Sequence, residues 1–358
     1  MTAGAPSSQT RTLRATVSAL PRTGSAPLAT SLAMEYDKRL MVVSGRANPE
    51  LAGRIADKLG LSLGGVELRT FTNGEVYCRF EESMRGADVF IVQPTCGNPS
   101  TGITANDALM ELLLMIDAAV GASAHRVIAV TPWYGYSRQD KKSMGREPIS
   151  ARLVARALET AGADRVVAMD LHAGQIQGFF SKPVDHMTAM GMLTQYFNDM
   201  QLPDLVVVSP DAGRVKLAKK FADKLGAELA ILNKERPAQQ VAEIAYVIGD
   251  VKGKNAVIID DIVDTAGTLR AAAETVKEEG ASRVFAAATH AVLSGAAFEN
   301  LAASAFEQVV VTDTIPVRPG APDNIKILSV ADVLTDTIRR IFTDDSVSEV
   351  FGGENQLF

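Results

Sequence analysis

The feature that most constrains the fold is a repeated alternation of short apolar runs with amphipathic segments. The apolar runs are near-continuous stretches of Val, Ile and Ala, which is typical of parallel strands buried on both faces. We predict strands at 40–44, 88–93, 126–132, 165–171, 205–210, 256–261, 283–290 and 309–315. Helical patterns between them cover 49–60, 107–121, 148–162, 214–226 and 268–280. This order predicts an α/β fold with doubly wound, mostly parallel sheets.

The length of the chain sets the number of domains. With 358 residues and roughly 150 residues per domain as a guide, we predict two α/β domains of similar size, at 36–188 and 189–345. One segment departs from the strand and helix alternation: FTNGEVYCRF (71–80) alternates polar and apolar residues after an Asn-Gly turn. That pattern predicts a β-hairpin or flap.

The first 34 residues differ from the rest of the sequence. They are rich in Ser, Thr, Ala and Pro and contain Arg11, Arg14 and Arg22 but no acidic residue. We expect residues 1–35 to be a disordered N-terminal extension and exclude them from the fold. A start codon placed too early, with Met34 as the true initiator, and a transit peptide are the other interpretations.

Composition excludes several classes of function. A net charge of −6 provides no basic field for a nucleic-acid backbone, so we expect no nucleic-acid partner. The most apolar helical stretch, 108–120, is interrupted by Glu111 and Asp117 and is too short to cross a bilayer, so we expect no membrane partner. Two cysteines without metal-site spacing, Cys78 and Cys96, favour a reducing compartment. We predict the cytoplasm, or a plastid if residues 1–34 are a transit peptide.

The stretch AVIIDDIVDTAGTL (256–269) combines two unlike chemistries. A predicted strand ends in Asp260 and Asp261, and a Thr/Gly loop then leads into a predicted helix. The free N–H groups at the start of a helix favour a phosphate, whereas carboxylates accept hydrogen bonds from hydroxyl groups. Asp264 or Thr265 alone would be read as an ordinary helix cap. The whole string instead predicts a ligand with a hydroxyl end and a phosphate end.

This string resembles the phosphoribosyl-pyrophosphate (PRPP) motif of type I phosphoribosyltransferases and PRPP synthetases. The resemblance implies the phosphoribosyltransferase type I fold for both domains, with the motif in the second. It also implies that Asp260 and Asp261 hold the ribose hydroxyls, directly or through a second Mg²⁺. The 5-phosphate is then held by the loop of Asp264, Thr265, Ala266, Gly267 and Thr268.

Further motifs distinguish between these two branches. In chain order they are FTNGE (71–75), ANDALMELLLMIDA (105–118), YGYSRQDKK (134–142), REPISARLVA (146–155), RVVAMDLHAGQIQGFF (165–180), LVVVSPDAG (205–213), LNKER (232–236), ATHAVLSG (288–295) and VSEVF (347–351). Together they are similar to the ribose-phosphate pyrophosphokinase (PRPP synthetase) family, in its bacterial, phosphate-regulated type. The resemblance extends from about Tyr36 to the C-terminus.

The resemblance implies a reaction and residues that perform it. The diphosphoryl group of MgATP is transferred to the anomeric hydroxyl of ribose 5-phosphate, giving PRPP and AMP for nucleotide, histidine and tryptophan biosynthesis. His172 and Asp211 help place Mg²⁺ with the ATP phosphates, and Lys234 and Arg236 close over the reacting phosphates from a mobile loop. Taken alone, His172 is typical of a core or loop histidine, and Lys234 and Arg236 are typical of a solvated turn after a strand at 229–232.

The resemblance also implies an oligomer and a regulatory site. Adenine is assigned to a neighbouring subunit's flap, and Arg138 and Gln139 contact the same nucleotide. The assembly is expected to be a homohexamer activated by phosphate and inhibited by ADP, with residues 346–358 forming a tail near the regulatory site. The flap residues are Phe71, Asn73 and Glu75, and the regulatory residues are Ser83, Arg85, Ser346 and Ser348.

The sequence departs from the family pattern at two places, and two alternative functions are compatible with parts of it. His186 stands where the family commonly has Asn, which makes phosphate activation less certain than catalysis, and the segment 94–107 is longer than the usual loop. A salvage phosphoribosyltransferase would use one PRPP motif without the second set of motifs. A catalytically dead regulatory subunit of PRPP synthetase type would have lost His172 or the NKER loop, and both are present.

Overall fold

The computed structural model describes residues 38–235 and 244–351. In this part of the chain the strands are β1 (Arg39–Ser44), β2 (Val66–Thr70), β3 (Val76–Phe80), β4 (Ala87–Val92), β5 (Arg126–Thr131), β6 (Arg165–Met169), β7 (Val184–Met187), β8 (Leu205–Ser209), β9 (Glu228–Glu235), β10 (Ile244–Ile248), β11 (Asn255–Val263), β12 (Arg283–Ala291), β13 (Gln308–Thr312) and β14 (Ile325–Leu328). The helices are α1 (Pro49–Leu59), α2 (Ala105–Gly121), α3 (Ser150–Ala161), α4 (Met190–Asp199), α5 (Val215–Leu225), α6 (Gly267–Glu278), α7 (Ala297–Ala302) and α8 (Ala331–Thr343), with short 3₁₀ turns η1 (Gly174–Phe179), η2 (Ala212–Arg214) and η3 (Val347–Phe351).

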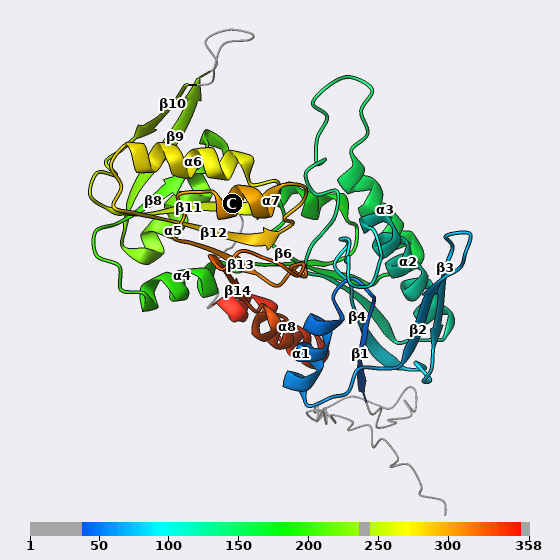
Figure 1. The fold of residues 1–358 in the computed structure, drawn as a ribbon. Helices are drawn as coiled ribbons and strands as arrows, with labels where there is room; N and C mark the ends of the chain where they lie inside the picture. The colour runs from blue at the N-terminus through cyan, green and yellow to red at the C-terminus, as the bar shows by residue number, and fades with distance from the viewer. Residues whose placement is uncertain (1–37, 236–243, 352–358) are drawn as a thin grey trace, which may run out of the picture.

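The strands form two main sheets that lie in two halves of the molecule (Figure 1). The first half contains a five-stranded parallel sheet in the order β1-β4-β5-β6-β7. The second half contains a seven-stranded sheet in the order β10-β9-β8-β11-β12-β13-β14, in which only the β9–β10 pair is antiparallel. The predicted α/β class with mostly parallel sheets is confirmed.

Both faces of each sheet are buried, which is why the strands read as continuous apolar runs. In β1, Leu40 and Val42 belong to a core that also contains residues of the second sheet, such as Val207 and Val257. The alternate residues of β1 point to the opposite face and pack with α2 and α3. A separate core covers the outer face of the second sheet, beside α6 and α7. The two halves therefore share one central core, and each has an outer core of its own.

Helices α1 and α8 pack against each other between the halves (Figure 1). Helix α1 has Pro49 at its first turn, Asn48 as its N-cap and Gly60 in the left-handed conformation at its end, all typical boundary signals. The chain passes from the first sheet to the second between β7 and α4. The predicted domain boundary near residue 188 stays a prediction because the shared core crosses it.

The carboxyl ends of strands from the two halves meet. Asp170, which follows β6, accepts hydrogen bonds through Oδ2 from the Ala189 N–H at 2.8 Å and from the Thr289 hydroxyl at 2.6 Å. Asn48, at the start of α1, donates to the Asp313 carbonyl at 2.8 Å. These buried polar contacts hold the functional edges of both sheets together.

The hairpin of β2 and β3 confirms the predicted flap. Its strands pair antiparallel from Val66 opposite Phe80 to Thr70 opposite Val76. It lies on the outer side of the first half, beside α2 and away from the second sheet (Figure 1). No helix within the described ranges is long and apolar enough to cross a membrane.

Candidate active site

The strand order of the second sheet creates a crevice. The chain leaves β8 toward β9 on one side, whereas β11 lies on the other side of β8, so the order reverses between them. In open parallel sheets, ligands bind beyond the carboxyl ends of the strands at such a reversal. Strand β11 pairs with β8 only as far as Ile258 but continues beside β12 to Val263. The residues after Ile258 therefore face the crevice on their β8 side.

Asp260 and Asp261 lie at this point of β11, and a histidine from the first half reaches them. His172 Nδ1 lies 2.7 Å from Asp261 Oδ2. Arg214, which follows β8, places Nη2 2.8 Å from Asp261 Oδ1 and Nε 3.2 Å from Asp260 Oδ1. Asp261 is only 7% exposed. A buried carboxylate requires such partners, because an unpaired charge in a low-dielectric interior is costly.

The two carboxyl groups differ in proton affinity. Burial raises the pKa of Asp260 to about 8, and the neighbouring Asp261 charge adds to this rise. Burial acts in the same direction on Asp261, but the hydrogen bond from His172 and the charge of Arg214 outweigh it and lower the pKa to about 2. The opposite shifts mean that the pair holds a proton more readily on Asp260 than on Asp261.

A pocket of about 240 Å³ opens beside this group, and both halves contribute to it. From the first half come the residues around His172, and from the second half come Arg214, Asp260 and Asp261 together with Thr289. The structure thus brings together Asp260 and Asp261, which were predicted to bind the sugar, and His172, which was predicted to bind the nucleotide phosphates.

The predicted phosphate loop joins β11 to α6. Ala266 adopts the left-handed conformation with φ of 59°, and α6 begins at Gly267. The Asn300 side chain donates to the Thr265 carbonyl at 2.9 Å and fixes the turn. A Cβ placed on Gly267 would meet only Asn300 of this chain, at 3.9 Å. Packing within the chain therefore does not require this glycine, and its open side is available for a ligand.

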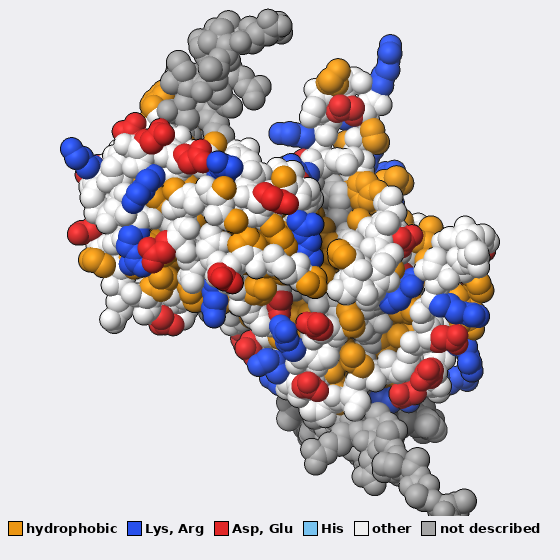
Figure 2. Space-filling model, in the orientation of Figure 1, with side chains coloured by type: hydrophobic (Ala, Val, Ile, Leu, Met, Phe, Trp, Pro, Cys, Tyr) orange, Lys and Arg blue, Asp and Glu red, His pale blue; other side chains and the backbone are white. Residues whose placement is uncertain are grey.

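Asp264 connects the phosphate loop to the first half. Arg138 Nη1 donates to its Oδ2 at 2.5 Å, and the Ser294 hydroxyl donates to its Oδ1. Arg138 comes from the segment between β5 and α3, which projects from the first half beside the cleft (Figure 1). The space-filling view shows a notch between this segment and the second half (Figure 2). The YGYSRQDKK motif and the PRPP motif therefore contact each other across the two halves, through Arg138 and Asp264.

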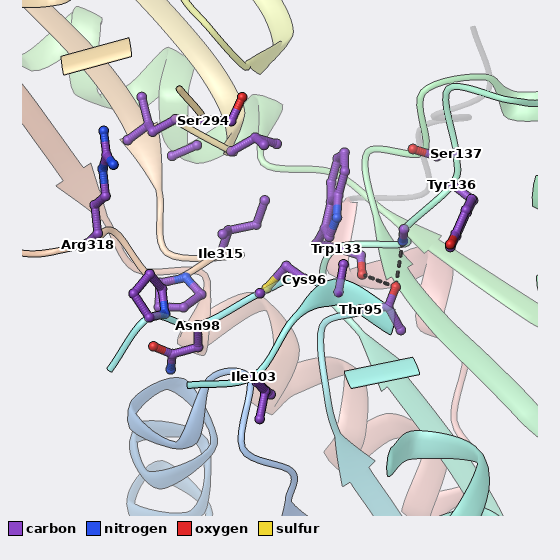
Figure 3. A pocket seen from close by; sticks show the side chains of 18 of the residues that line it. Thr95, Cys96, Asn98, Ile103, Trp133, Tyr136, Ser137, Ser294, Ile315 and Arg318 are labelled. Carbon is purple, nitrogen blue, oxygen red and sulfur yellow. Dashed lines mark hydrogen bonds between the residues drawn. The ribbon is translucent and has the colours of Figure 1, made fainter. Parts of the chain in front are cut away.

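A larger cavity of about 710 Å³ lies beside this contact (Figure 3). Arg138, Gln139 and Trp133 line it from the first half, and Ser294 and Arg318 line it from the second. Residues of the long segment 94–107 form one wall. That wall is held by Asn98, whose amide group donates to the Ala47 carbonyl at 3.0 Å and whose N–H donates to the Ile103 carbonyl at 3.0 Å. The long segment is thus built into the cleft.

The loop that carries His172 is supported by a second histidine. The N–H of Leu171 donates to His186 Nε2 at 2.9 Å, and His186 lies on β7. Burial lowers the pKa of His186, which keeps its ring neutral and able to accept this bond. The residue that departs from the family pattern therefore helps to position the backbone just before His172.

The predicted flap residues lie outside both pockets. Phe71 is 41% exposed, and the Arg69 guanidinium lies 5.0 Å from its ring centre. The Asn73 side chain accepts from the Glu75 N–H at 3.1 Å within the turn. An exposed aromatic ring at a hairpin tip that contributes nothing to the chain's own cleft fits the predicted role toward a neighbouring subunit, which stays a prediction.

The predicted lid residues are only partly described. Lys234 lies in β9, opposite Ala245 of β10, whereas the resemblance implied a mobile loop and the residue alone a turn after a strand ending at 232. The strand is longer than expected because β10 pairs with it and satisfies its backbone groups. Arg236 lies outside the described residues.

The predicted regulatory residues fall into two pairs. The carbonyl of Ser83 accepts a hydrogen bond from Arg39, at the start of β1, and Arg85 follows two residues later. The hydroxyls of Ser346 and Ser348 lie 2.7 Å apart, and Arg340 donates to the Ser346 carbonyl at 3.1 Å. Nothing in the described part of the structure links the two pairs, so their shared role stays a prediction.

The side chains of the crevice fit a Mg²⁺ ion that is bound together with a nucleotide better than one held by protein groups alone. Among the described residues, no group of three or more His, Cys, Asp or Glu side chains could hold a metal ion. Asp211 caps η2 by accepting from the Arg214 N–H at 3.0 Å, and His172 uses Nδ1 toward Asp261, so Nε2 remains to face a ligand. Mg²⁺ usually binds through one or two protein groups plus substrate phosphates. The residues therefore fit an ion that arrives with a nucleotide.

Sequence reasoning missed Arg214. The residue follows Asp211 by three positions at the same strand end, and that position was the one signal available. Its contacts with Asp260, Asp261 and His172 join three segments that are far apart in the sequence.

Comparisons with known proteins agree with this geometry. Residues 40–162 match the N-terminal domain of ribose phosphate pyrophosphokinase, and residues 237–352 match the phosphoribosyl synthetase-associated domain. The ribose-phosphate pyrophosphokinase of Caldanaerobacter subterraneus subsp. tengcongensis is 51% identical over 88% of this chain and 99% of its own length. The same enzyme of Clostridium perfringens is 49% identical over 88% of this chain and 98% of its own length.

A solved structure supports the same assignment. The crystal structure of phosphoribosylpyrophosphate synthetase from Mycobacterium smegmatis is similar with a TM-score of 0.80 and 47% identity, over 85% of this chain and 99% of that one. These matches do not favour a salvage phosphoribosyltransferase or a non-catalytic subunit. The chain belongs to the ribose-phosphate pyrophosphokinase family.

Proposed function

We propose that this chain transfers the diphosphoryl group of MgATP to the anomeric hydroxyl of ribose 5-phosphate, giving PRPP and AMP. The observation that carries the proposal is the meeting of the two halves at one cleft. His172 of the first half lies 2.7 Å from Asp261, and Arg138 of the first half lies 2.5 Å from Asp264. The predicted nucleotide residues therefore contact the predicted sugar phosphate residues, as a transfer between two substrates requires.

The second half binds ribose 5-phosphate in this proposal. The oxygens of Asp260 and Asp261 accept hydrogen bonds from the ribose hydroxyls. The loop from Asp264 to Thr268 surrounds the 5-phosphate, because its N–H groups and the positive end of the α6 dipole favour an anion. Together they hold the anomeric hydroxyl in a fixed position beside the first half.

The first half and a neighbouring subunit bind ATP. Arg138 and Gln139 contact the nucleotide from the segment after β5, and the neighbour's Phe71, Asn73 and Glu75 hold the adenine. An aromatic ring and a planar guanidinium can enclose a purine, while amide and carboxylate groups read its amino edge. His172 and Asp211 contact the phosphate end. This division requires an assembly, which we propose to be a homohexamer.

Mg²⁺ is the proposed cofactor, and when bound with ATP it neutralises oxygens of the transferred group. Around it, His172 Nε2 and the Asp211 carboxylate orient the phosphate end. Lys234 and Arg236 close over the phosphates and stabilise the negative charge that develops during transfer. Closure also excludes water, which limits wasteful hydrolysis of ATP.

Regulation by phosphate and ADP is the finer part of the proposal. Ser83, Arg85, Ser346 and Ser348 offer hydroxyl and guanidinium donors, which are suited to an anion. His186 bonds to the backbone beside His172, so the departure from the family pattern affects the catalytic loop as well. We propose the cytoplasm as the compartment.

The product assay tests this proposal directly. Purified protein is incubated with ribose 5-phosphate and MgATP, with and without inorganic phosphate, and nucleotides and PRPP are separated by chromatography. We expect AMP and PRPP in equal amounts, with a higher rate in the presence of phosphate. ADP in place of AMP would mean transfer of a single phosphoryl group and would contradict the proposed reaction.

A further inference from the structure

Arg214 contacts both carboxylates of the acidic pair and the histidine beside them. Its Nη2 lies 2.8 Å from Asp261 Oδ1 and 2.9 Å from His172 Nδ1, and its Nε lies 3.2 Å from Asp260 Oδ1. Its Nη1 also donates to the His172 carbonyl at 3.4 Å. One guanidinium therefore spans both carboxylates and the loop from the other half.

The backbone fixes this arginine in place. Arg214 ends the η2 turn, and its N–H donates to the Asp211 carboxylate at 3.0 Å. Its side chain is 21% exposed, unlike a solvated surface arginine. A planar fork of donors held by its own turn loses little conformational entropy when it bonds two carboxylates.

Two adjacent carboxyl groups at a buried edge need a cation between them. Besides the proton that Asp260 favours, a divalent ion or a guanidinium can stabilise the remaining negative charge, and these two cations compete for the same oxygen atoms. Here Arg214 already bonds the Oδ1 atoms of both Asp260 and Asp261, while His172 approaches Asp261 Oδ2. A metal ion that bridged the pair would have to displace either the arginine or His172.

We propose that Arg214 is the built-in counter-ion of the acidic pair and takes the place of a second divalent ion at the ribose end. The pair then receives the ribose hydroxyls by direct hydrogen bonds, and Mg²⁺ is needed only with ATP. Arg214 is a positioning residue, because it acts through Asp260, Asp261 and His172. The identity of the hydroxyl ligand rests on the proposed function, whereas the exclusion of a metal does not.

Binding of Mn²⁺ to the nucleotide-free protein tests the proposal, because electron paramagnetic resonance counts bound Mn²⁺ without any turnover. We expect the native protein and its Asp260→Asn variant to bind the same number of Mn²⁺ ions. We expect Arg214→Ala to gain one Mn²⁺ per chain and the double variant Arg214→Ala/Asp260→Asn to lose it again. Arg214→Lys, which keeps the positive charge, should not gain the site.

Arg283→Ala is the matched control. It removes one arginine from an ion pair with Glu307 at the opposite end of the same sheet and should leave the Mn²⁺ count unchanged. The proposal would be overturned if the native protein bound a Mn²⁺ ion that is lost in Asp260→Asn. This comparison does not require Arg214→Ala to fold. An Arg214→Ala protein that folds but binds no additional Mn²⁺ would also overturn it.

Kinetics separates this proposal from the proposed function. At fixed MgATP, the native rate should not rise with free Mg²⁺, whereas Arg214→Ala should regain activity as free Mg²⁺ increases. The rate of Arg214→Lys, which keeps the charge but not the planar fork, should not depend on free Mg²⁺ either. Failure of the native protein to form AMP and PRPP would overturn the proposed reaction. The Mn²⁺ counts would still decide the role of Arg214.

Discussion

The two sheets of this molecule share their architecture but differ in strand order, and the difference explains how the cleft is built. The five-stranded sheet runs in sequential order, whereas the order of the seven-stranded sheet reverses between β8 and β11. The reversal opens a crevice, and Asp260, Asp261 and Arg214 lie in it. The first sheet has no such reversal and contributes through loops that reach across, carrying Arg138 and His172.

The difference also divides the chemistry. In the proposed function, the second half supplies acids for sugar hydroxyls and a helix start for a phosphate, while the loops of the first half supply a cation and a histidine. If this division is correct, substitutions in the crevice should damage the ribose end most, and substitutions in the loops of the first half should mainly affect the nucleotide.

The largest effect is expected inside the acidic pair. Asp261→Asn removes a buried carboxylate, which leaves His172 without its acidic partner and Arg214 with Asp260 alone. We expect a cost of ~3–5 kcal/mol in stability and loss of PRPP synthesis. Asp260→Asn is the matched control, because burial raises the pKa of Asp260 and so favours its neutral form. Thermal unfolding and kcat/KM for ribose 5-phosphate measure both. Equal damage from the two changes would mean that the protonation assignment is wrong.

The next largest effect is expected on kcat, from a substitution at the end of β9 in the seven-stranded sheet. Lys234→Ala should reduce kcat by about 10²-fold, as removal of a group that stabilises transition-state charge does, and should leave nucleotide affinity nearly intact. Rapid-quench kinetics and equilibrium ATP binding separate the two quantities. Unchanged kcat would show that the β9 strand end is not part of the lid.

Arg138→Ala tests the loops of the first half. We expect KM for ATP to rise about tenfold, because a charge-assisted hydrogen bond contributes ~1.5 kcal/mol or more. Protein stability should change by less than about 1 kcal/mol, since the Arg138–Asp264 pair is solvent-exposed. Lys142→Ala, an exposed cation of the same segment, is the control. A rise in KM for ribose 5-phosphate alone would assign Arg138 to the other substrate.

The smallest effect is a pH dependence of protein stability that arises from His186, which supports the loop carrying His172. Burial lowers the pKa of His186 below its ordinary value of 6.5, so the unfolded chain binds a proton at acidic pH before the folded chain does. The native protein should therefore lose stability relative to His186→Asn as pH falls below about 6.5, by at most ~1.4 kcal/mol per pH unit. Melting temperatures from pH 8 to pH 5 measure this. Parallel curves for the two proteins would exclude a titrating role for His186.

Much of the fold was predictable because parallel strands buried on both faces leave continuous apolar runs. Strand β7 was not predicted, because two of its four residues, Asp185 and His186, are polar. They are accommodated by tertiary contacts: Arg165 donates to Asp185 at 2.8 Å, and His186 accepts from the Leu171 N–H. Local patterns cannot indicate partners that lie on other strands.

The candidate site was predictable to the extent that its chemistry lies in contiguous strings. Asp260 and Asp261 stand out because two acids end an apolar run. Arg214 has no comparable local signal, since its importance depends on β8 and β11 being neighbours although 46 positions separate Arg214 from Asp260. Lys234 was expected in a mobile loop, because the pairing of β9 with β10 is not visible in the sequence of β9 alone.

The central claim is that the two halves form one active site, and a double-mutant cycle between them tests it most directly. We would measure kcat/KM for ribose 5-phosphate in the native protein, His172→Ala, Asp261→Asn and the double variant. Residues in contact should be coupled by ~0.5–3 kcal/mol, so the double variant should be clearly less impaired than the sum of the single changes. Strict additivity would contradict the account.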